Sequence, residues 1–414
     1  RYVVGTCPYC KADDQYSDLC EKCGRVPEEI ENPHCSICGQ TPVKKKTKHY
    51  FFKLKNFSDK ISQYLNDNKN LQKDVKKYVQ NWIKEGLTDW DITRDISWGI
   101  PIPDGGANQK VFYGWFDNHL AYISSTIKFL NGNGKDGKKF WNESDIYHFI
   151  GKDIVYHHYL FLPAIRLGIE EEYKLPDYIP TRGHLTLQSK KISKSRNWYI
   201  GLKDFLAIFP ADYLRFYLIS INPYSQDDLN FNWGEFATKI NSELIGNLGN
   251  LVNRTLGFTV KSFNGAVPGP DEFDDIDNES KKMINELVSH LGILMEENHL
   301  DRALKKILQF SAHFNQYFQH KEPWKNGPGT NTCVFLSVNA IRSLAIAVYP
   351  FLPESSQKIW LQLGLDGNVS AQMFDEISNI TLKQGHKLGS VSPLFEKVEE
   401  SVIEEQKSKL GASS

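Results

Sequence analysis

Apolar residues are spaced differently in successive parts of the chain, and this spacing predicts different elements. Residues 1–50 contain many Cys, Gly and Pro residues and no helical period, so we expect turns there. The apolar run His49–Phe52 is typical of a strand. The 3.6-residue period from Ser58 to Glu85 predicts one helix, with Ser58 as its N-cap.

Residues 96–184 carry strand and helix patterns in turn. We expect strands at Val111–Trp115, Ile146–Ile150 and Tyr178–His184, with a helix over Asp153–Leu167 between the last two. A strand, a helix and a second strand in this order indicate parallel α/β architecture.

From Trp233 onward, Leu, Ile and Phe recur at helical spacing, and prolines separate the helical stretches. This pattern predicts an antiparallel all-α bundle. The expected helices are Glu235–Phe258, Glu279–Glu297, Asp301–Gln319, Thr332–Tyr349 and Ser355–Leu363.

Composition and charge narrow the class of protein. The 414 residues are 40% hydrophobic and 24% charged, which excludes a disordered or collagen-like chain. With a formal net charge of −1, any nucleic-acid binding must come from local patches. No apolar run approaches the roughly 18 residues that a membrane span needs, so we expect no membrane partner.

Six of the seven cysteines lie in the first 38 residues as three Cys-x-x-Cys pairs. Such crowding favours metal binding over a disulfide scaffold and suits the reducing cytoplasm. Two pairs supply the four thiolates of a tetrahedral, structural zinc site, which leaves no position open for a catalytic water. The pairs are Cys7 and Cys10, Cys20 and Cys23, and Cys35 and Cys38.

The third pair, Cys35 and Cys38, is only half of a zinc site. His34 or His49 could complete it, although histidines in such positions are more commonly surface or core residues. A further Cys-x-x-Cys pair upstream of Arg1 is the simpler completion.

Lysines and serines alternate between Gly183 and Asn197, which predicts a mobile polar loop after a strand. Such a loop can wrap phosphates, because ammonium groups neutralise charge while hydroxyl and backbone N–H groups donate hydrogen bonds. A solvated basic turn is the alternative, and the neighbouring segments decide between the two.

Three segments together resemble the methionyl-tRNA synthetase family. Residues Lys191–Ser195 (KISKS) are similar to the lysine loop of class I synthetases, with Ile where Met is commonest. Tyr147–His158 resembles the family's strand-to-helix segment, and Phe112–Tyr122 resembles its methionine-pocket segment. The resemblance runs in order from Arg1 to about residue 405.

This resemblance implies a fold class and a domain order. The chain would form the second half of a Rossmann-like catalytic domain with a zinc-knuckle insertion, followed by an all-α anticodon-binding bundle. The implied domains are the connective insertion (1–95, with its knuckles in 1–50), the catalytic half (96–184), the lysine-loop domain (185–234) and the anticodon-binding domain (235–414).

The family activates methionine with ATP and Mg²⁺ and passes it to tRNA(Met), chiefly by positioning and charge stabilisation. The resemblance implies that Lys191 and Lys194 are catalytic residues that contact the phosphates. Gly151 would allow close approach of the nucleotide, and Asp153 would accept hydrogen bonds from it. Leu185 would offer backbone groups to the adenine. Asp153 is also a good N-cap for the helix that follows, and it could serve both purposes.

The methionine slot must be apolar and tolerant of a thioether, which aromatic edges suit. The resemblance implies that it is lined by Trp115, Tyr122, Ile154 and His158. The chain departs from the family pattern at Asn118 and His119, where a small residue and Pro are usual, and at Ala121, where Gly is usual. These departures place the floor of the slot in question.

In the helical half, Asn250 and Arg254 are four residues apart and share a helix face. An amide and a guanidinium suit unstacked loop bases, and Trp324 adds a stacking plane. The resemblance implies that these three residues read the CAU anticodon. Lys44–Lys48 could support the acceptor end of the tRNA, although a solvated lysine run is the simpler interpretation.

No two of the twelve histidines are three residues apart, so the family's His-x-Gly-His tetrapeptide is absent from the sequence. We therefore expect the N-terminal half of the synthetase to be a missing partner and this chain to be inactive alone. The alternative is a tRNA-binding module without catalysis. A class I synthetase for another apolar amino acid is a weaker third hypothesis, because no editing-sized insertion is present.

Overall fold

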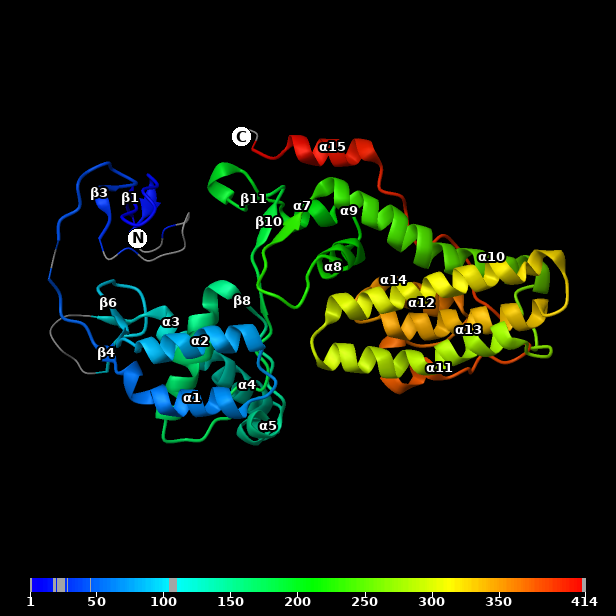
Figure 1. Ribbon diagram of the computed structural model, residues 1–414, viewed down its shortest axis with the longest axis horizontal. Coiled ribbons are helices and arrows are strands. Elements are labelled where there is room, and N and C mark those ends of the chain that lie inside the picture. Colours follow the sequence, from blue (N-terminus) through cyan, green and yellow to red (C-terminus); the bar gives the residue numbers. More distant parts are fainter. Residues whose placement is uncertain are drawn as a thin grey trace. The chain divides into compact units, whose positions relative to one another are not determined.

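The computed structural model describes residues 2–17, 20, 27, 29–44, 46–103 and 110–411 (Figure 1). The chain divides into two compact units. The first comprises Arg1–Lys53 and Asp89–Asn118, and the second comprises Leu54–Thr88 and His119–Ser414. The first unit is therefore built from two chain segments with a helical segment of the second unit between them in sequence.

Short antiparallel strands form much of the first unit, including part of residues 1–50, where turns were expected. The strand expected over His49–Phe52 is confirmed at Phe51–Phe52. Its three-stranded sheet has the order β2-β1-β3, and the pairs β4–β5 and β6–β7 make two further ribbons. The expected strand Val111–Trp115 is confirmed only over Val111–Phe112, because α3 begins at Gly114. The elements are β1 (Val3–Thr6), β2 (Gln15–Tyr16), β3 (Glu31–Cys35), β4 (Phe51–Phe52), β5 (Trp90–Asp91), β6 (Thr93–Arg94), β7 (Val111–Phe112) and α3 (Gly114–Asp117).

The second unit opens with a helix pair, not with the single helix expected over Ser58–Glu85. After the 3-10 turn η1 (Leu54–Phe57), α1 (Ser58–Asp67) and α2 (Lys73–Glu85) are separated at Asn68. The Asn68 amide donates to the backbone carbonyls of Pro176 and Asp177, which holds the break. The N-cap prediction is also wrong: Phe57 occupies that position, and the Ser58 hydroxyl donates back to Lys55 O.

The predicted parallel α/β arrangement is confirmed next in the chain. Strand β8 (Ile150–Gly151) pairs in parallel with β9 (Thr181–Arg182). The helix expected between them is divided into the 3-10 turn η3 (Lys152–Ile154), the π-helical η4 (His157–Phe161) and α6 (Leu162–Gly168). Before β8 come η2 (Asn118–Leu120), α4 (Ala121–Gly132) and α5 (Gly137–Glu143).

The lysine-rich segment belongs to a small sheet. Strand β10 (Leu185–Leu187) lies between β11 (Lys190–Lys191), antiparallel to it, and β12 (Leu229–Phe231), parallel to it. Beneath this sheet, aromatic rings pack closely, including Phe231 and Trp233 with centroids 5.0 Å apart. Further elements here are η5 (Lys194–Arg196), α7 (Leu202–Leu206) and α8 (Ala211–Ser220).

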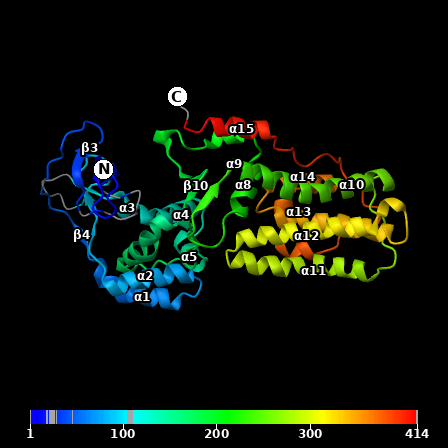
Figure 2. The ribbon, with the colours of Figure 1, turned by 45° about the horizontal axis from the view of Figure 1, so that its top comes forward.

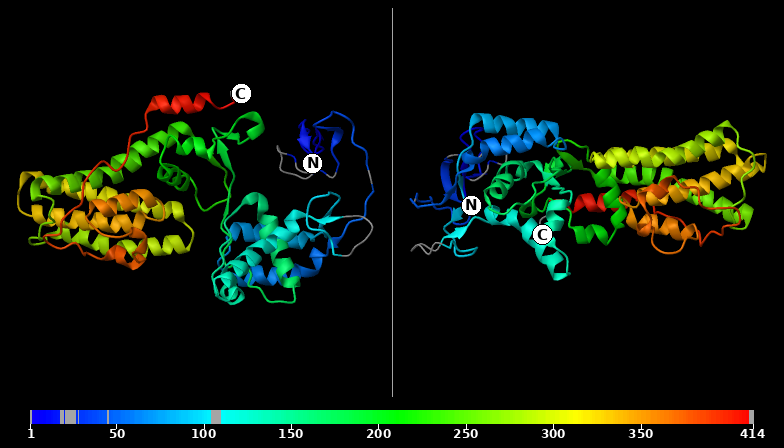
Figure 3. Two further views of the ribbon diagram at one scale, coloured as in Figure 1. Left: turned by 180° about the vertical axis from the view of Figure 1, so that it is seen from behind. Right: turned by 90° about the horizontal axis from the view of Figure 1, so that it is seen from below.

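The predicted helix bundle is confirmed, with boundaries within about a turn of those expected (Figures 2 and 3). The helix expected over Glu235–Phe258 is one helical run whose centre, η6, has π geometry. Helices α11 and α12 are joined by three residues and pack along each other. The elements are α9 (Trp233–Lys239), η6 (Ile240–Gly249), α10 (Asn250–Phe263), α11 (Asp275–Glu296), α12 (Leu300–Lys321), η7 (Pro323–Lys325), α13 (Thr330–Val348), α14 (Pro353–Gln362), η8 (Val369–Ala371), η9 (Phe374–Ser378) and α15 (Glu400–Ser408).

Helix α13 corrects one expectation from the sequence. Among the described residues it is long and apolar enough to cross a membrane by length and composition, and 89% of that window is buried in the bundle. Its two largest buried polar residues have partners: the Asn339 amide donates to Leu382 O, and the Arg342 guanidinium donates to Glu376 O. A core helix passes the same test of length and composition, so α13 is weak support for a membrane span.

Candidate functional site

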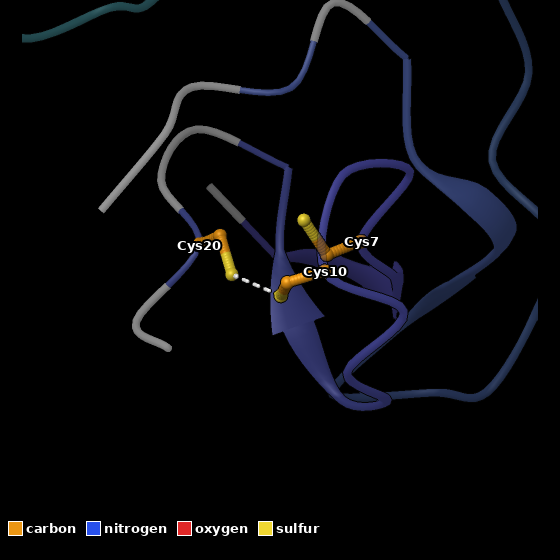
Figure 4. Close-up of side chains that lie close together, drawn as sticks. All are labelled: Cys7, Cys10 and Cys20. Carbon is orange, nitrogen blue, oxygen red and sulfur yellow. Dashed lines mark hydrogen bonds between the residues drawn. The ribbon is translucent and has the colours of Figure 1, made fainter. Parts of the chain in front are cut away.

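Three cysteine sulfurs converge in the first unit. The Sγ atoms of Cys7, Cys10 and Cys20 all lie within 4.8 Å of one another (Figure 4). The Cys10 and Cys20 sulfurs are 3.6 Å apart, and Cys7 and Cys20 are fully buried. Cys23, the predicted fourth ligand, lies outside the described residues. The arrangement can hold a metal ion through thiolates, and the fourth ligand of the predicted tetrahedral site stays a prediction.

The third pair forms a turn of the same type. The Gly39 N–H donates to Cys35 O, and Gly39 has a φ of 71°, which glycine adopts without strain. Backbone N–H groups of Cys38 and Ile37 hold the pKa of the Cys35 thiol below its usual range. His49, one candidate to complete this site, hydrogen-bonds to the Thr93 hydroxyl at 2.9 Å.

The predicted lysine loop forms a hairpin. Gln188 and Ser189 turn the chain with positive φ values of 49° and 60°. The Ser189 N–H donates to Asn230 Oδ1, and the indole N–H of Trp198 donates to Leu187 O. Side-chain to backbone hydrogen bonds support the turn in this structure, and the mobility of the loop stays a prediction.

The two predicted catalytic lysines are both on the surface of this hairpin. Lys191 is in β11, and Lys194 begins η5. Leu185, the predicted adenine contact, begins β10 and lines an apolar hollow beneath the sheet. The geometry presents two ammonium groups to solvent from this hairpin.

A charged cluster joins the predicted nucleotide residues to this hairpin. His184, which immediately precedes β10, has its Nε2 3.3 Å from Asp153 Oδ1. Its backbone N–H donates to Asp228 Oδ1 at 2.8 Å. The Lys152 ammonium, 2.8 Å from the same oxygen, holds the pKa of Asp228 below its usual range. His184, Asp228 and Lys152 were not singled out in the sequence, because nothing local marks them.

The absence of a side chain at Gly151 leaves room for the Asp153 carboxylate in this cluster. A Cβ on Gly151 would lie 2.5 Å from Asp153 Oδ1. Asp153 does not cap the following turn with its side chain, since Gly151 holds the N-cap position without a side-chain bond. The N-cap alternative for Asp153 is therefore wrong, and its carboxylate faces His184.

The structure brings three of the four predicted methionine residues together. Tyr122 Oη lies 3.3 Å from His158 Nε2, and His158 Nδ1 lies 3.2 Å from Ile154 O. A cavity of about 340 Å³ beside them is lined largely by aromatic residues, including Tyr122, His158 and Trp141. Trp115, the fourth residue, lies in α3 of the first unit, where it is 37% exposed.

Further histidines that the sequence did not identify as a group surround His158. His119 Nε2 is 3.2 Å from His157 Nδ1, and the His148 ring lies 5.4 Å from that of His158. Burial lowers the pKa of His119 and His148 to about 3 and that of His157 to about 4, and the charge of Arg166 adds to the effect on His119 and His148. The cluster is neutral near pH 7. The departure from the family pattern at His119 thus places a buried, neutral imidazole against His157 and His158.

The three predicted anticodon residues converge on the bundle surface. The Arg254 guanidinium lies 4.9 Å from the ring centroid of Trp324. Arg254 Nη2 donates to Gln319 Oε1 at 2.7 Å, and Asn250 Nδ2 donates to Asn315 Oδ1 at 2.8 Å. Trp324 is 41% exposed, so part of its ring is open to a stacking partner.

The lysine run is only partly described, since Lys45 lies outside the described residues. Lys44 forms an ion pair with Glu29, and Lys46 and Lys48 are exposed. Its support of tRNA stays a prediction.

Comparison with known proteins gives consistent matches along the chain. The family model described as tRNA synthetases class I (M) matches residues 1–256, and the model of the anticodon binding domain of methionyl tRNA ligase matches residues 267–414. A methionine–tRNA ligase of Methanopyrus kandleri is 40% identical over all of this chain and 62% of its own length. The ligase of Saccharolobus islandicus is 37% identical over 99% of this chain and 74% of its own length.

A solved structure extends the likeness to the fold. Mycobacterium tuberculosis methionyl-tRNA synthetase in complex with methionyl-adenylate is 25% identical, has a TM-score of 0.77, and is matched over 88% of this chain and 71% of that chain. The chain spans about 60% of the length of the first curated relatives that it matches. The first family model matches more than half of the chain, and the chain covers 74% of the Saccharolobus islandicus ligase at 37% identity. The chain therefore belongs to the methionyl-tRNA synthetase family of class I tRNA synthetases.

Proposed function

We propose that this chain is the part of a methionine–tRNA ligase that carries the lysine loop and reads the anticodon. The observation that carries this proposal is the contact between His184 and Asp153. Through this contact, the residue just before the lysine hairpin lies against Asp153, whose carboxylate we assign to nucleotide binding. A pure RNA-binding module has no need of this juxtaposition.

In the activation step, a methionine carboxylate oxygen bonds to the α-phosphorus of ATP, and the bond to the pyrophosphate oxygen breaks. Negative charge grows on the leaving pyrophosphate. Lys191, in β11, and Lys194, at the start of η5, are both exposed, and their ammonium groups neutralise this charge. Mg²⁺ bound with ATP supplies further neutralisation of the phosphates. Gly151 and Asp153 hold the nucleotide, with Asp153 oriented by His184.

Methionine binds beside Tyr122, Ile154 and His158, which lie together in the second unit. The family resemblance also assigns Trp115 to methionine binding. Neutral imidazoles and aromatic edges suit a thioether, whereas a charged imidazolium there would favour polar side chains. The low pKa of His148 supports this assignment, because His148 lines the cavity and its imidazole stays uncharged near pH 7. The adenylate then passes its methionyl group to tRNA(Met).

Zinc is the metal that best fits Cys7, Cys10 and Cys20, with Cys23 as the fourth ligand. The close sulfur spacing and the absence of any disulfide among the described cysteines support a thiolate site. The role is structural, since four sulfurs leave no coordination position open. Cys35 and Cys38 offer a second, incomplete pair.

Methionine-dependent ATP–pyrophosphate exchange tests the ligase assignment. We expect background exchange with the chain alone, because it lacks the His-x-Gly-His tetrapeptide, and exchange above background once the N-terminal segment of a full-length relative is added. Lys194→Ala should abolish that gain. A chain that binds a CAU stem-loop selectively but shows no exchange under either condition would support the second candidate, a non-catalytic tRNA-binding module. The departures from the family pattern at Asn118 and His119 are the observation that favours this candidate.

A further inference from the structure

A pair of amide side chains on α12 contacts the pair of anticodon residues on α10. Asn315 and Gln319 are four residues apart, as are Asn250 and Arg254, so each pair shares one helix face. Asn250 Nδ2 donates to Asn315 Oδ1 at 2.8 Å. Arg254 Nη2 donates to Gln319 Oε1 at 2.7 Å. These two hydrogen bonds link α10 to α12 side by side, and we call the Asn250–Asn315 bond the first rung and the Arg254–Gln319 bond the second rung.

The first rung is anchored more deeply in the bundle. Asn315 Nδ2 donates to Asn247 O at 2.9 Å and lies 3.1 Å from Asn247 Oδ1. The Asn247 amide in turn donates to Leu308 O. Asn315 therefore uses its oxygen for Asn250 and its nitrogen for Asn247, which leaves its amide a single orientation.

Asn247 lies in the π-helical segment η6, directly before α10 begins at Asn250. A π-helical turn is wider than an α-helical turn and changes which residues face a neighbouring helix. In this chain it places Asn247 and Asn250 against the same residue, Asn315, of α12.

The second rung restrains a guanidinium that also lies against aromatic rings. The Arg254 Cζ is 4.9 Å from the Trp324 centroid and 5.0 Å from that of Phe318, which is buried. A long arginine side chain has many rotamers, and fixing it on binding RNA costs affinity. The contact with Gln319 holds Arg254 in one conformation before the RNA arrives.

We propose that Asn315 and Gln319 are positioning residues for anticodon recognition, acting through Asn250 and Arg254. This inference rests on the proposed reading of the anticodon by Asn250, Arg254 and Trp324. The two amides set the direction of the recognition groups, and their removal lowers both affinity and the preference for the correct loop.

Gln319→Met tests the second rung, because Met has a similar length and offers no comparable acceptor. With the full chain at fixed salt, we expect binding of a CAU stem-loop to weaken by about two- to tenfold. The ratio of affinities for CAU and for a loop with one changed base should fall as well. Gln319→Glu keeps an acceptor at this position and should restore the ratio. Gln309→Met is the matched control, since it makes the same change on the same helix ten residues earlier.

A double-variant cycle separates positioning from direct contact. If Gln319 acts through Arg254, Gln319→Met should have no further effect in the Arg254→Ala background. An undiminished effect in that background would show that Gln319 contacts the RNA itself and would overturn the inference. Asn315→Leu should behave in the same way with Asn250→Ala.

Different experimental results would contradict the positioning role and the proposed anticodon recognition. If the parent chain does not prefer CAU, or if Trp324→Ala and Arg254→Ala bind like the parent, the anticodon assignment is wrong. If those variants lose binding while Gln319→Met and Asn315→Leu keep the parent's affinity and preference, the positioning role alone is wrong. Thermal unfolding of each variant shows whether a loss of binding reflects a loss of the fold.

Discussion

The His184 imidazole and the Asp153 carboxylate lie 3.3 Å apart, although their positions in the sequence differ by 31. His184 stands at the start of the lysine hairpin, and Asp153 stands just after β8. The contact links the two segments of the proposed nucleotide site. A shift of the hairpin would therefore move a partner of Asp153.

Lys194→Ala should lower methionine-dependent pyrophosphate exchange by about 10²–10³, because a preorganised cation at the leaving group is lost. Exchange is measured with the chain joined to the N-terminal segment of a relative. Lys190→Ala is the matched control on the same hairpin, where the ammonium lies 4.4 Å from the Trp198 ring centroid and the residue has no assigned phosphate contact. Equal losses in the two variants would argue against a specific role for Lys194.

Gly151→Ala should weaken ATP binding while leaving the fold intact. The added Cβ would approach Asp153 Oδ1 to 2.5 Å and displace the carboxylate. We expect the KM for ATP to rise with little change in Tm. Gly257→Ala is the control, since no atom lies within 4 Å of its Cβ position and alanine stabilises a helix interior by roughly 0.5–1 kcal/mol.

Metal analysis after gel filtration should give close to one zinc per chain. Cys20→Ser should release it, because Cys20 is one of the three clustered sulfurs. Cys35→Ser should retain it, since Cys35 belongs to the other pair. Loss of the same zinc in the Cys35 variant would mean that the pairing is wrong.

Trp324→Ala should weaken binding of a CAU stem-loop by roughly ten- to a hundredfold, the range of base stacking on an aromatic ring. The ring is 41% exposed and fixed beside Arg254. Lys194→Ala, in the lysine hairpin, should bind the stem-loop like the parent. A titration of labelled stem-loops at fixed salt measures both.

The buried histidines predict a loss of stability in acid. The pKa of His119 and of His148 is about 3 in the folded chain, below the usual value of an unfolded histidine. The unfolded chain therefore binds more protons between about pH 6.5 and pH 3, and the free energy of unfolding falls as the pH falls through that window. From pH 7.5 to 5.5 each histidine should contribute a loss of about 1 kcal/mol.

Urea unfolding at the two pH values measures this dependence. His119→Gln should flatten it, whereas His290→Gln, at an exposed position of α11, should leave it unchanged. If the free energy of unfolding of the His119→Gln variant depends on pH as it does in the parent, the conclusion that burial lowers the pKa of His119 is wrong.

The features predicted from sequence were local ones. Cys7 and Cys10 face one point because two residues separate them, and the bundle helices follow from their apolar period. The helix break at Asn68 could not be predicted, because the carbonyls that bind its amide belong to Pro176 and Asp177, more than 100 residues away. The same holds for Gln319, whose partner Arg254 is 65 residues away. Which residues contact each other across such distances in the sequence depends on tertiary packing, and the apolar period of a helix does not reveal that packing.

The apolar character of α13 has a consequence for how the chain folds. During synthesis α13 leaves the ribosome before Glu376 and Leu382, whose carbonyls accept hydrogen bonds from Arg342 and Asn339, have emerged. For that interval a stretch apolar enough to enter a membrane is covered only by the earlier helices. Docking of α13 onto α11 and α12 therefore competes with aggregation and chaperone capture. Substitutions that loosen this early packing should reduce the yield of folded protein more than they reduce the stability of the protein that does fold.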